Sequence, residues 1–402
     1  MLGLLLGERG DTEGLVDCEP LARVRRLLGN AALAGGDSIP GAEQLSARSV
    51  VMHALVRLLD PQRHHGGSVA AVDQLKSLIC SQRVMHRLLQ AVADAYVALS
   101  AAERGGYDWE PLAWRLGISL TAVEHMLFCC EPAAEIATTA PVQCGAAAAV
   151  SFPEHLLSVL GALGPRRLAA QQEAAGGKEA VLGVIRALNN LAHTRLAAAE
   201  ALGRAGALRV CLSLLGELAG PPEAPADRCA LPFPHLLENV DACNQLLVLM
   251  INLVDHAASN RARAIAAGVA SQGGMPAAAG EFLCLLLRSA VGLSGRGEEG
   301  ASEQAPGSPR EVTEESLLRR EREGEARSML VYLSVLLGFL MVSEDKAASQ
   351  ALREHVTIAV PGNQGLVAVR QGILECLTFY SRAGAMERRD LVQLQRLLEA
   401  LA

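Results

Sequence analysis

The stretch QLLVLMINLVDHAASNRARAIAAG, residues Gln245–Gly268, decides the fold of this chain. Its first half is apolar at helical spacing, a short polar segment follows, and then a second helical pattern begins. This order is typical of an inner helix of a helical repeat, a tight turn and the start of the next helix. We therefore expect the chain to be built from stacked helices.

An upstream echo of this stretch, RALNNLAHTRLAAAEALGRAG, runs from Arg186 to Gly206. In both copies an Asn-Leu pair ends an apolar helix, and an Ala-Gly pair follows at the same distance. A long chain with such an internal echo is more typical of a stacked scaffold than of an enzyme built around a pocket. The predicted structural repeat positions are Asn190, Leu191, Gly206, Asn252, Leu253 and Gly268.

The composition predicts an all-α protein with a HEAT/armadillo-like helical repeat solenoid. Half of the 402 residues are apolar but only 3% are aromatic, and alanine and leucine dominate. Small and branched side chains of this kind suit helix-on-helix packing, whereas sheets favour β-branched and aromatic residues. The formal net charge of -7 argues against broad binding to nucleic acid or anionic membranes.

The cysteines and the apolar runs indicate a soluble, intracellular protein without a metal or cofactor. The ten cysteines include no CxxC pair, so we expect buried free thiols in a reducing compartment. The longest apolar run, Met329–Val342, is shorter than the ~20 residues that span a bilayer, and a buried core helix is predicted. The N-terminal MLGLLL is too short for a signal peptide.

Three segments organise the chain in this interpretation. Residues 1–135 form an N-terminal helical-repeat lobe, and residues 136–150, which carry little charge and no clear period, form a connector. Residues 151–402 form a C-terminal lobe. Within that lobe, the low-complexity acidic insertion 294–313 has too little apolar surface to offset the entropy of ordering, so disorder is predicted there.

The segment Leu112–Leu127, LAWRLGISLTAVEHML, has the spacing of a helix-turn-helix with a turn at Gly117. One interpretation is a DNA-recognition helix, and the other is a tight helical hairpin inside the scaffold. The second half of the segment contains no arginine or lysine, and phosphate contact requires positive charge. The hairpin is therefore the preferred interpretation.

Histidines near the repeat turns raise the question of catalysis. His193 and His256 follow the two Asn-Leu pairs, and Asp255 precedes His256. No nucleophile elbow or glycine loop for an oxyanion accompanies them, so solvent-facing turn residues are predicted. The adjacent His64 and His65 make a weak case for a metal site.

The repeated asparagines Asn190 and Asn252 have two interpretations. An asparagine near the end of an inner helix can hydrogen-bond the backbone of the adjacent repeat and fix the stacking register. The alternative is a peptide-binding asparagine ladder, as in armadillo proteins. Because the sequence shows only two asparagines at this repeated position, the structural role is preferred.

Three blocks of the C-terminal half resemble the conserved domain of the Wapl (wings apart-like) family of cohesin-release factors. The first is Lys178–Leu191, and the closest is Leu246–Arg261, with its Ile-Asn-Leu-Val and Asn-Arg elements. The third is Met329–Glu354 with the following His355–Ala383, which includes a Leu-Leu-Gly helix and an Arg-Glu pair. The resemblance covers residues 178–402, and the family's long N-terminal extension with short aromatic motifs has no counterpart in this sequence.

The resemblance implies a nuclear, non-enzymatic HEAT-repeat module without a cofactor. Such a module binds cohesin through its kleisin and HEAT-type accessory subunits, and promotes the release of cohesin from chromatin. Each candidate contact residue has a plainer interpretation as a solvated turn residue or as part of a helix-end ion pair. The candidate partner-binding residues are Asp255, Asn260, Arg261, Arg353 and Glu354.

Three rivals remain open. A generic armadillo-type adaptor in the cytoplasm has the same fold and an unrelated partner. A DNA-binding regulator uses residues 112–127. An enzyme requires an acid, a base or a nucleophile in a cluster, and the sequence shows no such cluster.

Overall fold

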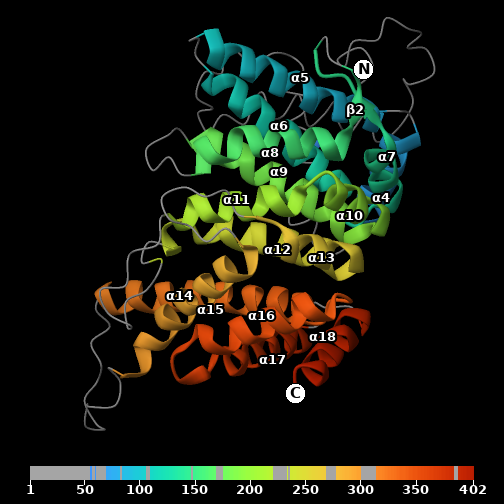
Figure 1. Ribbon diagram of the computed structural model, residues 1–402. Helices are drawn as coiled ribbons and strands as arrows, with labels where there is room; N and C mark the ends of the chain where they lie inside the picture. The colour runs from blue at the N-terminus through green and yellow to red at the C-terminus, as the bar shows by residue number, and fades with distance from the viewer. Residues whose placement is uncertain are drawn as a thin grey trace, which may run out of the picture. The chain divides into compact units, whose positions relative to one another are not determined.

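The computed structural model describes residues 55–56, 59, 69–81, 84–105, 109–145, 148–168, 175–220, 233, 236–268, 278–299, 314–383 and 388–402. These residues form fifteen α-helices, two short 3-10 helices and one two-stranded ribbon (Figure 1). The predicted all-α helical-repeat fold is therefore confirmed. The helical patterns predicted before residue 55 and the His64–His65 pair lie outside the described residues.

Residue contacts divide the chain into two compact units. The first comprises residues 1–163 and 170–198, and the second comprises residues 164–169 and 199–402. In the first unit, α6 packs against both α5 and α9. Its described elements are α4 (Val69–Ser81), α5 (Val84–Gly105), α6 (Glu110–Leu127), α7 (Glu131–Thr139), β1 (Pro141–Val142), β2 (Val150–Ser151), most of α8 (Phe152–Leu168) and α9 (Ala175–Thr194).

The second unit is arranged around α15, the longest helix, which packs against α12, α14 and α17. Helix α10 (Leu196–Arg204) spans the boundary, because its residues up to 198 belong to the first unit and its residues from 199 belong to the second. The remaining elements are α11 (Ala207–Ala219), η3 (Leu236–Asn239), α12 (Val240–His256), α13 (Ala258–Ala266), α14 (Ala279–Glu299), α15 (Glu314–Met341), α16 (Lys346–Ala359), η4 (Pro361–Asn363), α17 (Gly365–Ala383) and α18 (Arg388–Ala400).

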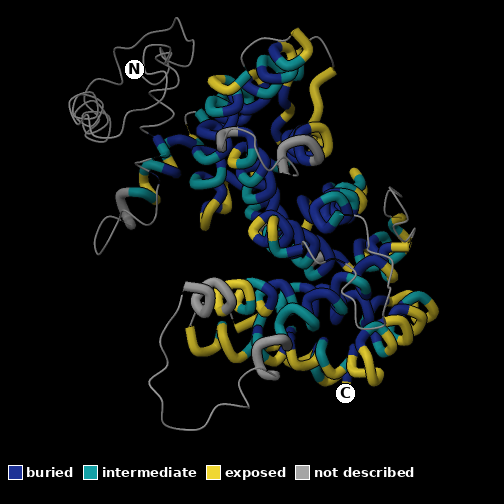
Figure 2. Tube along the Cα trace, turned by 90° about the vertical axis from the view of Figure 1, so that its left-hand side faces the viewer, coloured by how far each residue is buried: buried dark blue, intermediate teal, exposed yellow. Residues whose placement is uncertain are grey.

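A three-helix period runs along the chain. The long helices α6, α9 and α12 are each followed by a helix of only 9 residues, namely α7, α10 and α13. Helices α15 and α16 follow the same order but are both longer. A third helix completes each set of three, namely α8, α11, α14 or α17. The echo seen in the sequence falls on α9–α10 and α12–α13, as expected of armadillo-like repeats. Figure 2 shows buried residues gathered in the interior of the helical layers and exposed residues on the outer turns.

The prediction of a turn at Gly117 is wrong, because α6 runs without interruption from Glu110 to Leu127. Gly117 and Ser119 are buried inside this helix, and the backbone of Ala180 in α9 lies opposite Gly117. A glycine in a helix interior costs only about 1 kcal/mol relative to alanine, which packing against α5 and α9 readily offsets. Neither the helix-turn-helix nor the tight hairpin is therefore present.

Two segments predicted to be irregular contain regular structure. Residues 136–150 include the last turn of α7, and β1 pairs antiparallel with β2 through Pro141–Ser151 and Val142–Val150. Helix α14 extends to Glu299, so it includes the first residues of the acidic insertion 294–313. Residues 300–313 lie outside the described part of the chain.

The apolar run Met329–Val342 lies in the core of the second unit, as predicted. Residues 333–341 are all buried. The segment Arg320–Met341 is long and apolar enough to cross a membrane by length and composition alone, but 61% of its most apolar window is buried within the protein. A core helix of a soluble protein passes the same test.

The turn between α12 and α13 is closed by two side chains that follow it. The last four carbonyls of an α-helix have no partner inside the helix. Here the Asn260 amide donates to Leu253 O at 3.0 Å, and Arg261 Nε donates to Val254 O at 3.0 Å. The sequence AASNR therefore caps α12 from the start of α13.

Asn260 also connects this turn to α10. Its amide donates to Ala199 O at 2.9 Å, its carbonyl accepts from Arg263 at 2.6 Å, and its side chain is fully buried. The approach is so close that a Cβ atom at Gly203 of α10 would overlap the Asn260 amide. Glycine at position 203 therefore allows Asn260 to reach the backbone of α10.

We predict that Gly203→Ala lowers the free energy of unfolding by about 1–3 kcal/mol, since the added methyl forces Asn260 out of place. Gly324→Ala in α15 is the matched control, because nothing lies within 4 Å of its Cβ position. That variant should be neutral or stabilising by up to ~1 kcal/mol. Urea denaturation followed by circular dichroism measures both, and equal stability of the two variants would contradict the tight contact.

Candidate partner-binding groove

A groove in the second unit has a cavity volume of about 720 Å³. It lies between the start of α13, the end of α15 and one side of α18. Apolar side chains and four arginines line it together. The lining residues are Arg261, Phe339, Val342, Arg388, Arg389, Val392, Gln393, Arg396, Leu397 and Ala400.

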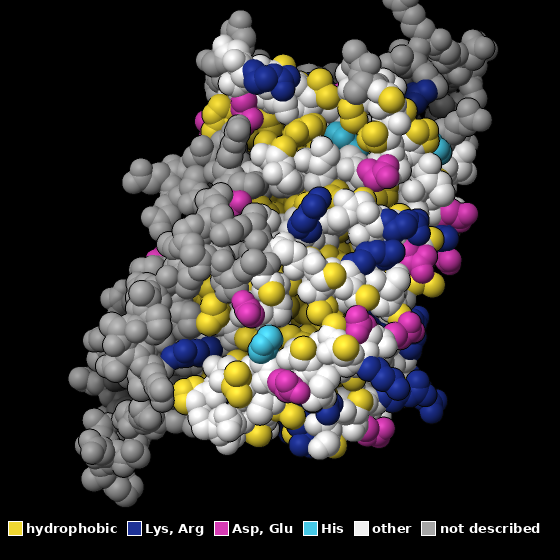
Figure 3. All heavy atoms as spheres, viewed as in Figure 1, with side chains coloured by type: hydrophobic (Ala, Val, Ile, Leu, Met, Phe, Trp, Pro, Cys, Tyr) yellow, Lys and Arg dark blue, Asp and Glu magenta, His cyan; other side chains and the backbone are white. Residues whose placement is uncertain are grey.

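The floor of the groove is apolar and its rim is basic. Phe339 and Leu397 are buried, whereas Arg388, Arg389 and Arg396 of α18 are exposed. Figure 3 shows a group of lysine and arginine side chains at the lower right of the view, where Figure 1 places α18. Because the whole chain carries a net charge of -7, this rim reverses the average sign of the surface. The groove therefore has the chemistry to bind an apolar group that carries negative charge nearby.

Arg261 links the floor to the turn that caps α12. Its guanidinium carbon lies 5.4 Å from the centroid of the Phe339 ring, in cation–π contact. Burial lowers the pKa of Arg261, and the neighbouring carboxylates of Asp255 and Glu344 oppose that shift. Arginine remains charged even so, so the groove keeps a half-buried cation at its inner edge.

Two polar contacts fix α18 beside the groove. The Gln393 amide donates to the Asp255 carboxylate, and Arg353 donates to Ala400 O at 2.7 Å. Gly338 in α15 faces Leu397, so closely that a Cβ there would lie 2.8 Å from a Leu397 methyl. The position of the rim arginines is thus set by residues of α12, α15 and α16.

The structure gathers three of the five residues that the sequence suggested as partner contacts. Arg261 lines the groove, while Asp255 and Arg353 hold α18 in place. Asn260 is buried and serves the α12–α13 turn, so it is a structural residue rather than a contact residue. Glu354 is exposed on α16 and accepts from Gln350 at 2.9 Å.

The rim arginines of α18 were not singled out from the sequence. The pattern RRDLVQLQR, residues 388–396, does place three arginines on the polar side of an amphipathic helix. Such a pattern marks a solvated helix face in most proteins. The sequence of α18 alone does not show the groove, because Phe339 of the floor comes from α15, about fifty residues upstream.

In the first unit, a polar joint couples α6 to α9. Asn190 donates to Glu124 O at 3.2 Å, which is the kind of bond expected of an asparagine near the end of an inner helix. Arg186 pairs with the Glu124 carboxylate at 2.8 Å. His125 contacts Val56 O at 3.2 Å and Thr121 donates to Gly117 O. The polar side chains in the second half of Leu112–Leu127, the segment with the predicted helix-turn-helix spacing, therefore make contacts within the protein.

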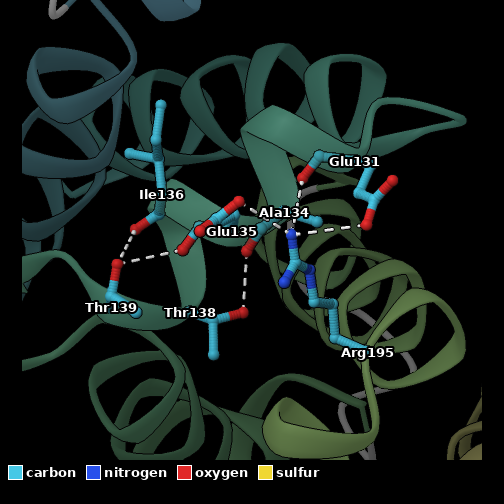
Figure 4. Close-up of polar contacts among 7 residues, drawn as sticks. All are labelled: Glu131, Ala134, Glu135, Ile136, Thr138, Thr139 and Arg195. Atoms are coloured by element: carbon cyan, nitrogen blue, oxygen red, sulfur yellow. Dashed lines mark hydrogen bonds and ion pairs between the residues drawn. The ribbon is translucent and has the colours of Figure 1, made fainter.

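Arg195, which directly follows α9, reaches across to α7 (Figure 4). Its guanidinium lies 3.1 Å from Glu135 Oε2 and 3.7 Å from Glu131 Oε1, and it also donates to Glu131 O at 3.5 Å. Both glutamates are largely exposed, so each pair contributes at most about 1 kcal/mol. Their role is to hold the short helix α7 against the end of α9.

A cysteine–histidine pair in the first unit has unfavourable electrostatics for catalysis. Cys144 Sγ lies 3.1 Å from His155 Nδ1, and the His155 ring is only 2% exposed and lies edge-on to Tyr96. Burial lowers the pKa of His155 to about 4 and raises the pKa of Cys144. A nucleophilic thiol requires the opposite shift, so this pair is a neutral hydrogen bond.

Other candidates for chemistry are sparse in the described residues. Within that part of the chain no group of three or more His, Cys, Asp or Glu side chains is arranged to hold a metal ion. His193 is exposed at the end of α9, as a turn residue should be.

Comparison with known proteins adds little to this picture. No family model matches the sequence, and no curated protein matches it. Among solved structures, an engineered protein is similar at 13% sequence identity, over 100% of this chain and 93% of that one, with a TM-score of 0.26. At that TM-score the similarity carries no argument about fold or function.

We predict that His155 makes the stability of the protein depend on pH. Its pKa is lower in the folded state (about 4) than the ordinary value of 6.5, so the unfolded chain binds more protons between those values. Stability should therefore fall as the pH drops from 6.5 towards 4, by about 2–3 kcal/mol. Urea denaturation at pH 7 and pH 4.5 measures this loss.

The matched pair of variants is His155→Gln, which removes the titration, and His86→Gln on the exposed side of α5. The pH dependence should become shallower in the first and stay unchanged in the second. A pH dependence that survives in His155→Gln would assign the effect to other groups.

Proposed function

We propose that this chain is a non-enzymatic helical-repeat scaffold that binds an acidic segment of a partner protein in the groove beside α18. The observation that carries the proposal is the set of four arginines around an apolar floor. Guanidinium groups bind carboxylates through paired hydrogen bonds, and an apolar floor contributes through burial of a partner side chain. The basic rim raises the rate of association with an acidic partner, while the apolar floor lowers the rate of dissociation.

We further propose cohesin as the partner, with regulation of its release from chromatin in the nucleus as the outcome. The support is the resemblance to the Wapl family. Two of the three blocks that carry it, Leu246–Arg261 and Met329–Glu354, also supply Arg261, Phe339 and Val342 to the groove. In this proposal the scaffold binds one conformation of the cohesin ring more tightly than another and so raises the population of that conformation.

A generic adaptor with a different partner uses the same groove. The two proposals differ in the partner alone, so they need separate experiments: one on the chemistry of the groove and one on cohesin.

The groove is tested with a displayed library of random peptides selected on the purified full chain. We expect enrichment of peptides that combine Asp or Glu with one or two large apolar residues. Arg388→Glu and Arg396→Glu should each weaken binding about tenfold or more, because a contact with a cation becomes a like-charge contact. Binding should also weaken as salt rises.

Arg370→Glu is the matched control, since Arg370 is exposed on α17 and does not line the groove, while the charge change is the same. It should change binding less than twofold. Selection of basic or uncharged peptides, or equal losses in all three variants, would contradict the proposed role of the groove.

The partner is tested by incubating the immobilised full chain with purified cohesin that contains the kleisin and its HEAT-type accessory subunit. We expect retention at about 0.1 M salt and loss of retention in Arg388→Glu. Absence of retention by the wild-type chain would exclude cohesin as the partner and leave the adaptor proposal standing.

A further inference from the structure

Three of the four groove arginines surround one place beside the middle of α18. Arg389 and Arg396 are two helical turns apart on the same face of α18, a rise of about 10 Å. Gln393 lies on that face between them, and its amide donates to the Asp255 carboxylate. Arg261 donates to the backbone carbonyl of the same Asp255 at 3.4 Å. The Arg261 guanidinium therefore lines the groove opposite the middle of this face.

The groove has an excess of positive charge. Four arginines line it, and its lining includes no aspartate or glutamate. The carboxylates of Asp255 and Glu344 lie near Arg261 and offset part of that charge. An excess of about two positive charges is left for a ligand to neutralise.

A phosphorylated side chain matches this excess better than a carboxylate does. A phosphate ester of serine or threonine carries about −1.5 to −2 charge near pH 7 and has three acceptor oxygens. A carboxylate has one charge and two oxygens. Guanidinium groups bind phosphate through paired hydrogen bonds, so three of them around one place suit a group with three oxygens. A carboxylate in the same position leaves part of the positive charge without a partner.

The apolar floor lies beside the same place. The buried Phe339 ring is 5.4 Å from the Arg261 guanidinium carbon, and the buried Leu397 directly follows Arg396. Val392, next to Gln393, lines the groove and is 38% exposed. In an extended peptide, side chains two residues apart point to the same side and are about 7 Å apart. One short segment can therefore place a phosphate among the arginines and an apolar side chain on the floor.

Building on the proposed binding of a partner segment in this groove, we propose that the segment carries a phosphorylated serine or threonine. Arg261, Arg389 and Arg396 surround its phosphate, and a large apolar residue of the same segment covers the floor. Phosphorylation of the partner then strengthens the complex, because an unmodified hydroxyl brings no charge to the three cations.

The test passes three libraries of synthetic peptides over the immobilised full chain and quantifies the retained peptides by mass spectrometry. Each library has random residues on both sides of one fixed position, which is phosphoserine, aspartate or serine. We expect the phosphoserine library to be retained about tenfold more than the aspartate library, and the serine library least. The retained phosphopeptides should be enriched in large apolar residues close to the phosphate.

Arg389→Gln and Arg396→Gln should each remove most of the preference for phosphoserine over aspartate. Arg370→Gln is the matched control, since Arg370 is exposed on α17 and does not line the groove. It should keep the preference. An equal effect of all three substitutions, or retained phosphopeptides without apolar enrichment, would assign the binding to overall charge and overturn the inference.

Two further results separate this inference from the proposed function. Equal retention of the phosphoserine and aspartate libraries would refute the phosphate site and leave the binding of an acidic segment standing, whereas retention of neither library would refute both. Sedimentation with phosphatidylcholine vesicles that contain a phosphoinositide should show no capture of the chain. Capture that Arg396→Gln abolishes would assign the groove to a lipid headgroup instead. If a variant fails to fold by circular dichroism, the comparison of the three libraries on the wild-type chain decides.

Discussion

The structure depends on how the carbonyls at the end of α12 are satisfied in a buried turn. A backbone carbonyl left without a partner away from water costs about as much as a lost hydrogen bond, so the turn must supply donors. Asn260 and Arg261 supply them from the next helix. That arrangement sets the start of α13, draws Asn260 onto α10, and places the Arg261 guanidinium over Phe339. The repeat joint and the inner edge of the groove thus follow from one capping requirement.

The sequence predicts the repeat well because the signals of a repeat are local. An apolar helix, an Asn-Leu pair and an Ala-Gly pair at fixed spacing need no knowledge of the rest of the chain. The backbone of the two turns still differs, since Gly206 has a positive φ of 90° and Gly268 does not. The turn predicted at Gly117 failed because packing against two neighbouring helices overrode a local breaker. Asn260 was misassigned because a polar residue after a helix resembles a solvated one, and only the tertiary structure shows its burial.

The groove was only partly predictable for the same reason. Three of its arginines come from α18, its buried floor from α15 and α18, and the arginine at its inner edge from α13, so no single stretch of sequence contains the pattern. Asp255 and Arg353 were predicted to be partner contacts, yet both hold α18 in place, and Asp255 also lies beside Arg261 of the groove. They act as positioning residues.

The contact between Asn260 and Gly203 also has a mechanical consequence. Stacks of helices bend by small sliding motions at the joints between repeats. At this joint, any slide of α13 along α10 stretches hydrogen bonds that no water can replace, and it presses an amide against a backbone that has no side chain to yield. The contact between α10 and α13 therefore resists sliding. We expect the second unit to bend instead where helices meet through apolar side chains alone.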